Sequence, residues 1–211
     1  MISVIDYGVG NLFSLKSSLD YIGLDTTLTN DIEKIKNSKG IILPGVGAFR
    51  DAIKNLEKYN LKDIIIEEAK SGKPFLGICL GMQLLFEKSY EYGEYNGLGL
   101  IHGEIDEIKK HISSELDLKI PHMGWNNLNV NDKFKDDKIL KNIDFENDVY
   151  VYYVHSYFAN TDIKNVIAYS DYGTNIPGIV KKNNVYGMQF HPEKSSDVGL
   201  KLLKNWGDLL W

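Results

Sequence analysis

The chain contains a single cysteine, Cys79, which lies between two glycines in the run Gly77-Ile78-Cys79-Leu80-Gly81. An apolar strand pattern precedes this run and a helical pattern follows it. A strand that turns through G-x-nucleophile-x-G into a helix is typical of a nucleophile elbow, where side chains at the glycine positions would collide with neighbouring elements. The start of a helix also favours thiolate, the reactive form of cysteine. The run therefore predicts a nucleophile rather than a small buried apolar residue, with the Leu80 N–H aimed at a developing oxyanion.

A candidate base lies in residues 186–196, where His191 and Glu193 follow an apolar strand pattern. In extended backbone a spacing of two places both side chains on one side. Glu193 would then hold the imidazole tautomer while the other ring nitrogen faces the thiol, as in a catalytic triad. The pair is common in proteins, so an incidental polar strand end is the alternative. Four other histidines compete for the role, of which the first two are expected at the surface: His102, His111, His122 and His155.

Two glycine-rich segments follow strand patterns. In residues 42–49, "ILPGVGAF", the backbone N–H groups could hold a phosphate or an oxyanion. No Lys-Ser/Thr pair follows, so a nucleotide site has little support. In residues 6–13, "DYGVGNLF", Phe13 occupies the third glycine position of a dinucleotide-binding loop, which argues against that function.

The composition bounds the class of protein. The 211 residues carry a formal net charge of −5, with 43% hydrophobic and 25% charged residues. The balance of hydrophobic and charged residues is normal for a globular chain, and the negative net charge argues against nucleic acid as the main partner. One cysteine excludes an internal disulfide and fits a cytoplasmic protein. We see no basic leader and no apolar stretch of about 20 residues, so no membrane association is expected. We expect no metal and no cofactor.

The pattern of elements predicts an α/β fold in one domain, residues 1–211. Apolar strand patterns alternate with helical ones in the first half, which indicates βαβ units on an open, mostly parallel sheet flanked by helices. From about residue 98 short β-branched and aromatic runs predict added, partly antiparallel sheet. The expected strands of the first half are 2–6, 40–45 and 74–78, and the expected helices are 12–22, 48–59, 62–72 and 80–89. Residues 116–120 are expected as a strand and residues 195–211 as a helix.

Six motifs taken together resemble a known family. They are "DYGVGN" (6–11), "PGVGAF" (44–49), "GICLGMQLLFE" (77–87), "PHMGWN" (121–126), "YVHSY" (153–157) and "QFHPEKS" (189–195). The second, third and sixth are similar to class I glutamine amidotransferases, which have a flavodoxin-like fold. With the other three, the whole chain resembles the glutaminase subunits of imidazole glycerol phosphate synthases, enzymes of histidine biosynthesis.

The resemblance implies a reaction. Cys79 would attack the side-chain amide of L-glutamine, and His191 would take the thiol proton and give it to the leaving ammonia. Glu193 would orient His191, and water would hydrolyse the thioester to L-glutamate. Backbone N–H groups at Val46 and Leu80 would stabilise the oxyanions of both steps.

The same resemblance implies binding residues and a partner. The residues expected to bind glutamine are Gly47, Gln83, Glu91, Ser156 and Tyr157. The residues expected to face a partner are Asn11, Trp125 and Lys194. That partner is a (β/α)₈-barrel synthase subunit, which would form a heterodimer with this chain and use the ammonia to make imidazole glycerol phosphate and AICAR. Core packing at a sheet edge is the alternative role for Trp125.

Three other functions stay open at this point. A stand-alone cysteine hydrolase, such as a peptidase, would use the same cysteine and histidine without a partner. A catalytically silent binding module would only dock another protein. A paralogous glutaminase subunit would feed a different amination, such as nucleotide-sugar amidination. For the expected glutaminase we hypothesise that the loop at Val46 completes the oxyanion hole only when the loaded barrel docks.

Overall fold

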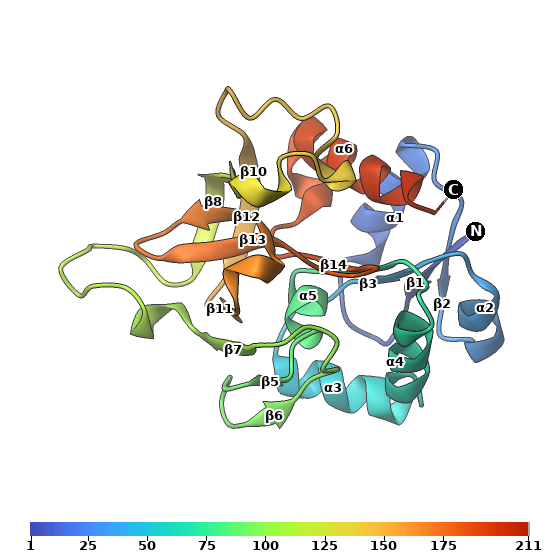
Figure 1. Cartoon of the computed structure of the whole chain (residues 1–211). Helices are drawn as coiled ribbons and strands as arrows, with labels where there is room; N and C mark the ends of the chain where they lie inside the picture. The colour runs from blue at the N-terminus through green and yellow to red at the C-terminus, as the bar shows by residue number, and fades with distance from the viewer. Residues whose placement is uncertain (211) are drawn as a thin grey trace.

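The computed structural model describes residues 1–210 and shows a central sheet of eight strands (Figure 1). The first five strands in spatial order are parallel and the last three join antiparallel, which confirms the predicted mostly parallel α/β fold. The spatial order is β2 (Thr26–Thr29), β1 (Ile2–Ile5), β3 (Ile41–Leu43), β4 (Phe75–Ile78), β14 (Val185–Met188), β13 (Asn175–Lys182), β12 (Val166–Asp171) and β9 (Asn129–Val130).

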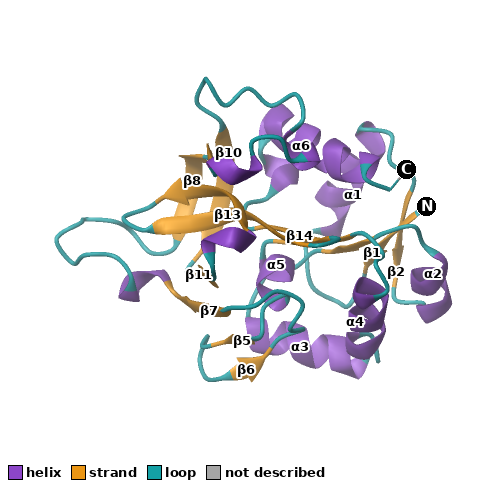
Figure 2. Ribbon diagram, viewed as in Figure 1, coloured by secondary structure: helices purple, strands orange, loops and turns teal. Residues whose placement is uncertain are grey.

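Helices cover both faces of this sheet (Figure 2). On one face lie α1 (Leu12–Tyr21) and α6 (Ser196–Asp208), which bury Leu19 and Trp206 against the strands. On the other face lie α2 (Ile32–Asn37), α3 (Phe49–Lys58), α4 (Lys62–Lys70) and α5 (Leu80–Leu84), with their own core cluster around Phe49 and Phe75. The parallel strands are apolar and buried because both of their faces are covered.

Two smaller sheets are added, mostly from the region after residue 98 where partly antiparallel sheet was predicted, although the short strands 88–89 and 95–96 precede that region and were not predicted. An antiparallel ribbon pairs β10 (Tyr150–His155) with β8 (His122–Asn127). A four-stranded sheet has the order β11 (Tyr157–Asn160), β7 (Glu104–Glu107), β5 (Lys88–Ser89) and β6 (Tyr95–Asn96). Five short 3₁₀ turns complete the described elements: Ile108–Lys110, Asp132–Phe134, Lys138–Leu140, Ile163–Asn165 and Pro192–Lys194.

Two expected elements were wrong, and other elements were missed. The strand β2 was missed because it is an edge strand of sequence TTLT without an apolar run. The short helix α2 that follows it was missed as well. The helix expected over 80–89 ends at Leu84, since the segment 98–101 returns to donate to the carbonyls of Leu84 and Leu85 at 2.8 Å. Residues 116–120, expected as a strand, lie in the connection between residue 110 and β8 and join no sheet.

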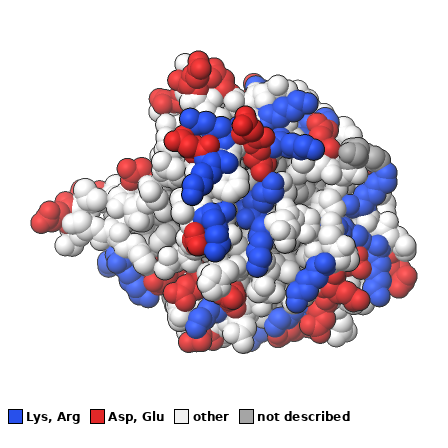
Figure 3. All heavy atoms as spheres, in the orientation of Figure 1, with Lys and Arg blue, Asp and Glu red and all other residues white. Residues whose placement is uncertain are grey.

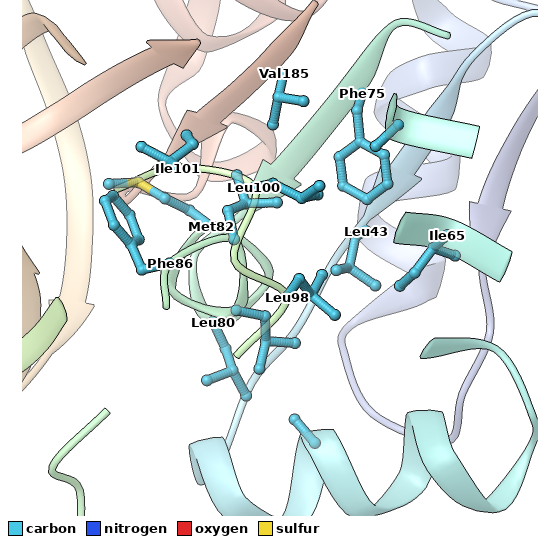
Figure 4. Packing of buried hydrophobic residues seen from close by; sticks show 14 of the residues in the cluster. Leu43, Ile65, Phe75, Leu80, Met82, Phe86, Leu98, Leu100, Ile101 and Val185 are labelled. Atoms are coloured by element: carbon cyan, nitrogen blue, oxygen red, sulfur yellow. The ribbon is translucent and has the colours of Figure 1, made fainter. Parts of the chain in front are cut away.

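The helix α5 is short but firmly embedded. Figure 4 shows Leu80 and Met82 of this helix among apolar side chains from the sheet and from the returning segment, including Leu43, Leu98 and Leu100. All of these side chains are buried. The packing holds the turn between β4 and α5 in place.

The surface charge is mixed. On the face seen in Figure 3, basic and acidic side chains are interspersed and neither sign forms a continuous field. Among residues 1–210 no helix is long and apolar enough to cross a membrane.

Candidate active site

The elbow predicted around Cys79 is present between β4 and α5. Cys79 has φ of 53°, a left-handed conformation that a residue with a side chain adopts at a cost of about 1–3 kcal/mol. A Cβ on Gly81 would lie 1.8 Å from the Leu43 carbonyl oxygen, and one on Gly77 would lie 2.6 Å from the Gly81 oxygen. Only glycine fits at either position. The strained turn is held because the Cys79 N–H donates to the Met188 carbonyl at 2.7 Å.

The predicted base lies beside this elbow because β4 and β14 are parallel neighbours whose carboxyl ends share one edge of the sheet. His191 Nδ1 and Glu193 Oε1 are 2.8 Å apart, and both side chains are 4% exposed. The expectation of extended backbone between them was wrong. Pro192 begins a 3₁₀ turn, and this turn brings the carboxylate back to the ring.

The electrostatics of His191 favour its charged form. Burial lowers the pKa of the imidazole, but the neighbouring Cys79 sulfur and the Glu193 carboxylate raise it more, so the pKa lies well above the ordinary 6.5. Among residues 1–210, His191 Nε2 has no hydrogen-bond partner. An imidazole that is protonated at this nitrogen can hold a thiolate and later release a proton to a leaving group.

A pocket of about 300 Å³ opens in front of the cysteine. It contains every residue predicted for catalysis, for the oxyanion or for glutamine binding except Glu193, which lies behind His191. The lining residues are Val46, Gly47, Cys79, Leu80, Gln83, Glu91, Tyr92, Pro121, Val154, His155, Ser156, Tyr157 and His191. Sequence reasoning missed four of them as pocket residues: Tyr92, Pro121, Val154 and His155. The last two belong to the "YVHSY" motif, which was the available signal.

The two expected oxyanion donors, the N–H groups of Val46 and Leu80, do not form a complete hole in this structure. The Leu80 N–H does not point freely into the pocket but donates to the Gly45 carbonyl at 3.3 Å. In a trans peptide the C=O and the N–H point in opposite directions, so the Val46 N–H of the same peptide is directed away from Leu80. The Pro44 carbonyl next to this peptide accepts from the buried Tyr7 hydroxyl at 2.7 Å. In this conformation neither expected donor is presented to a ligand.

Two of the predicted glutamine-binding side chains are engaged within the protein. Glu91 Oε2 accepts from the Phe49 N–H at 2.6 Å, at the start of α3. Burial raises the pKa of Glu91, and this hydrogen bond opposes the shift. Gln83 Nε2 donates to the Tyr157 carbonyl at 2.9 Å and to Gln189 Oε1 at 3.0 Å. Both N–H groups of Gln83 are therefore used, which leaves its Oε1 for a ligand.

The residues expected to face a partner are exposed. Asn11 caps α1 by accepting from the Ser14 N–H at 3.4 Å. Trp125 is 54% exposed on β8, so the alternative of core packing was wrong. The Tyr152 ring lies 6.0 Å from the Trp125 ring, and Lys194 Nζ lies 5.9 Å from the Tyr152 ring. Trp125, Tyr152 and Lys194 therefore form one continuous surface, while its use as an interface stays a prediction.

The competing histidines have other environments. His102 and His111 are at the surface, as expected, where they contact Glu87 and Asp106. His122 and His155 are buried and contact each other. Residues 1–210 hold no group of three or more His, Cys, Asp or Glu side chains that could bind a metal ion.

The fold and the pocket define an α/β protein with a strained cysteine elbow and a His-Glu pair at the carboxyl edge of a parallel sheet. Residues 3–207 match the family described as "Glutamine amidotransferase class-I". The subunit HisH of imidazole glycerol phosphate synthase from Caldanaerobacter subterraneus subsp. tengcongensis is 48% identical over all of this chain and 98% of its own length. The HisH subunit from Carboxydothermus hydrogenoformans is 47% identical over the whole of both chains.

Solved structures agree at the level of the fold. "Structure of PurLQS from Thermotoga maritima" contains a chain with a TM-score of 0.72 and 20% identity, covering 100% of this chain and 98% of that one. This chain belongs to the class I glutamine amidotransferase family and, within it, is similar along its full length to HisH subunits.

Proposed function

We propose that this chain is the glutaminase subunit of an imidazole glycerol phosphate synthase. It hydrolyses L-glutamine to L-glutamate and ammonia, and it passes the ammonia to a (β/α)₈-barrel subunit with which it forms a heterodimer. Full-length identity of 47–48% to HisH subunits supports the assignment. The observation that carries it is one pocket that joins Cys79 and His191 with the residues expected to bind glutamine.

The chemistry follows from the positions of the side chains. The Cys79 sulfur forms a bond to the glutamine amide carbon, and its proton resides on His191. The C–N bond then breaks as His191 gives this proton to the departing nitrogen, which leaves as ammonia. Water attacks the resulting thioester, with His191 accepting a proton, and glutamate is released as the thiol is restored. Glu193 holds the ring in the orientation that both transfers need.

We also propose that residues 1–211 act as one glutaminase domain in the cytoplasm. The central sheet draws strands from both halves of the chain, from β1 to β14, and the family match extends over residues 3–207. A boundary within the chain would cut this sheet.

Capture with a tagged copy of the chain, followed by mass spectrometry, should recover the barrel subunit. Recovery of a different synthase in its place would favour the paralogous amination.

The isolated chain should release glutamate slowly. The Leu80 N–H is occupied by the Gly45 carbonyl, and one donor in an oxyanion hole contributes about 10²–10³-fold to turnover. Docking of the barrel subunit with its ligand is therefore expected to raise glutamate release by about 10²–10³-fold, through a rotation of the Gly45–Val46 peptide. The measurement is glutamate release by the purified chain with and without the loaded barrel. Full activity of the chain alone would favour the stand-alone hydrolase.

We propose a short path for this control, from residues 6–11 to the loop at Val46. Residues 6–11, which include Asn11, contact the loop at Val46, since the Tyr7 hydroxyl donates to the Pro44 carbonyl at 2.7 Å. A Cβ on Gly10 would lie 3.8 Å from the Pro44 side chain and 3.9 Å from the Gly45 nitrogen. A partner that binds at Asn11 would therefore contact residues 6–11, which already touch the loop at Val46.

Trp125→Ala should weaken stimulation by the barrel more than it weakens the fold. The side chain is largely exposed, so its loss removes little buried area from the free chain. Aromatic residues at the centre of an interface, in contrast, often contribute about 2 kcal/mol or more to the free energy of binding. We expect a rise of roughly tenfold or more in the barrel concentration that gives half-maximal stimulation. The matched control is Tyr21→Ala, an exposed aromatic at the far end of α1. Equal effects of the two variants would argue against a specific role for Trp125.

A further inference from the structure

Two buried histidines take no part in the chemistry described above. His122 of β8 and His155 of β10 are 3% and 7% exposed, and His122 Nδ1 lies 3.0 Å from His155 Nε2. The His122 ring is stacked between Tyr153 and Tyr172, with ring centroids 4.6 Å and 4.0 Å away. The stacking fixes the plane of the ring, so its two nitrogens point in defined directions.

The outer end of the pair sets the position of one proton. Asn126 Oδ1 accepts from the Asn127 N–H at 2.8 Å, and Asn126 Nδ2 donates to the Asp171 carbonyl at 2.9 Å. These two bonds fix the amide orientation. The second N–H of Nδ2 faces His122 Nε2 at 3.2 Å, so this ring nitrogen must accept. A neutral His122 then carries its proton on Nδ1 and donates to His155.

The inner end requires the same direction. His155 Nδ1 lies 2.8 Å from the Tyr157 carbonyl oxygen, which can only accept. His155 therefore carries its proton on Nδ1, and its Nε2 is free to accept from His122. One arrangement therefore satisfies both ends. Asn126 donates to His122, His122 donates to His155, and His155 donates to the Tyr157 carbonyl.

Burial keeps both rings neutral, as this arrangement needs. Desolvation lowers the pKa of His122 to about 4 and, together with the neighbouring histidines His122 and His191, lowers that of His155 to about 3. An added proton on either ring would bring two N–H groups face to face or replace an acceptor by a donor.

The chain of hydrogen bonds ends at the predicted glutamine pocket. The Tyr157 carbonyl that accepts from His155 also accepts from Gln83 Nε2 at 2.9 Å. Gln83 Nε2 donates in addition to Gln189 Oε1 at 3.0 Å, and Gln189 Nε2 lies 3.9 Å from the Cys79 sulfur. The Tyr157 carbonyl is thus linked by hydrogen bonds to two buried amides, one of which contacts it directly while the other lies beside the nucleophile.

We propose that His122 and His155 are positioning residues for the glutamine pocket: as a pair of neutral Nδ1–H tautomers they hold the Tyr157 carbonyl and, through it, Gln83. This inference rests on the proposed function for its ligand, glutamine. Neither histidine touches the reacting atoms, so their effect is on the binding of substrate rather than on proton transfer.

Two substitutions of His155 separate hydrogen bonding from packing. His155→Phe keeps the ring shape and loses both bonds, whereas His155→Asn loses the ring and keeps a donor near the position of Nδ1. In the complex with the barrel subunit, His155→Phe should raise KM for glutamine about tenfold with a smaller change in kcat, because a buried donor and a buried acceptor lose their partners. His155→Asn should raise it less, by roughly threefold. His102→Asn, at an exposed histidine, is the control for general effects.

A packing role predicts the reverse order, with His155→Phe close to wild type and His155→Asn impaired, and that result would overturn the proposal. Denaturant unfolding of each variant shows whether a change in KM follows lost stability. If the wild-type complex released no glutamate, the proposed function would fail, while the hydrogen-bonded pair could still be tested on the free chain by the next measurement.

Nitrogen NMR of the histidine rings tests the pair without any activity. In the chain labelled with ¹⁵N at the imidazoles, we expect His122 and His155 to be neutral Nδ1–H tautomers at neutral pH and to remain so below the ordinary histidine pKa of 6.5. Comparison with His122→Phe and His155→Phe assigns the signals. A charged ring or an Nε2–H tautomer at either position would overturn the proposed arrangement.

Discussion

Cys79→Ser should reduce glutamate release by about 10⁴-fold or more, since loss of the nucleophile in a triad leaves only binding and oxyanion effects. A serine oxygen is a far weaker nucleophile at neutral pH, and His191 cannot hold it as an anion. The fold should persist because the exchange of sulfur for oxygen leaves the elbow and its glycines in place. The assay is glutamate release in the complex, with the free energy of unfolding as the control.

Covalent labelling gives an independent check of the same role. A glutamine-analogue diazo-ketone should modify wild-type chain at one site, Cys79, and should leave the serine variant unmodified. Partner binding by the serine variant should be retained, because Cys79 is 6% exposed and cannot reach a docking surface. Glutaminase activity that survives in the variant, or stoichiometric labelling elsewhere, would remove Cys79 from the mechanism.

The Cys79 elbow and the His191–Glu193 pair could be predicted because each depends on residues that are close together in the sequence. The elbow needs Gly77 and Gly81 on either side of Cys79, because a Cβ at either position would overlap backbone atoms of neighbouring elements. The His191–Glu193 pair is separated by only two positions. Its partnership was predicted correctly, although the backbone that forms it is a 3₁₀ turn that begins at Pro192.

The parts that could not be predicted depend on contacts between distant segments. The edge strand β2 is held by its pairing with β1, and its threonines give no apolar signal. The Leu80 N–H meets the Gly45 carbonyl across 35 positions of sequence, which no spacing rule indicates. The His122–His155 pair exists only because β8 and β10 pair in register, with the two histidines as direct partners.

His191→Asn should cost more activity than Glu193→Gln. Removal of a general base typically lowers the rate by about 10²–10⁴-fold, and His191 transfers protons in both halves of the proposed reaction. Glu193 only orients the His191 ring and stabilises its charged form, through one hydrogen bond of 2.8 Å between Nδ1 and Oε1. Glu193→Gln keeps an acceptor oxygen of the same shape, so the ring can hold its tautomer. We expect a loss of roughly tenfold in kcat for this variant, within the range of one hydrogen bond to a charged group.

The pH dependence separates the two roles further. Glu193 is one of the groups that raise the pKa of His191, so its neutral replacement should lower that pKa. The imidazolium gives its proton to the leaving ammonia, and a lower pKa means that this form is lost at a lower pH. The alkaline limb of the kcat profile should therefore move to lower pH in Glu193→Gln, while His191→Asn should show no such limb from this residue. If Glu193→Gln proved more damaging than His191→Asn, the assignment of His191 as the base and of Glu193 as the orienting group would be wrong.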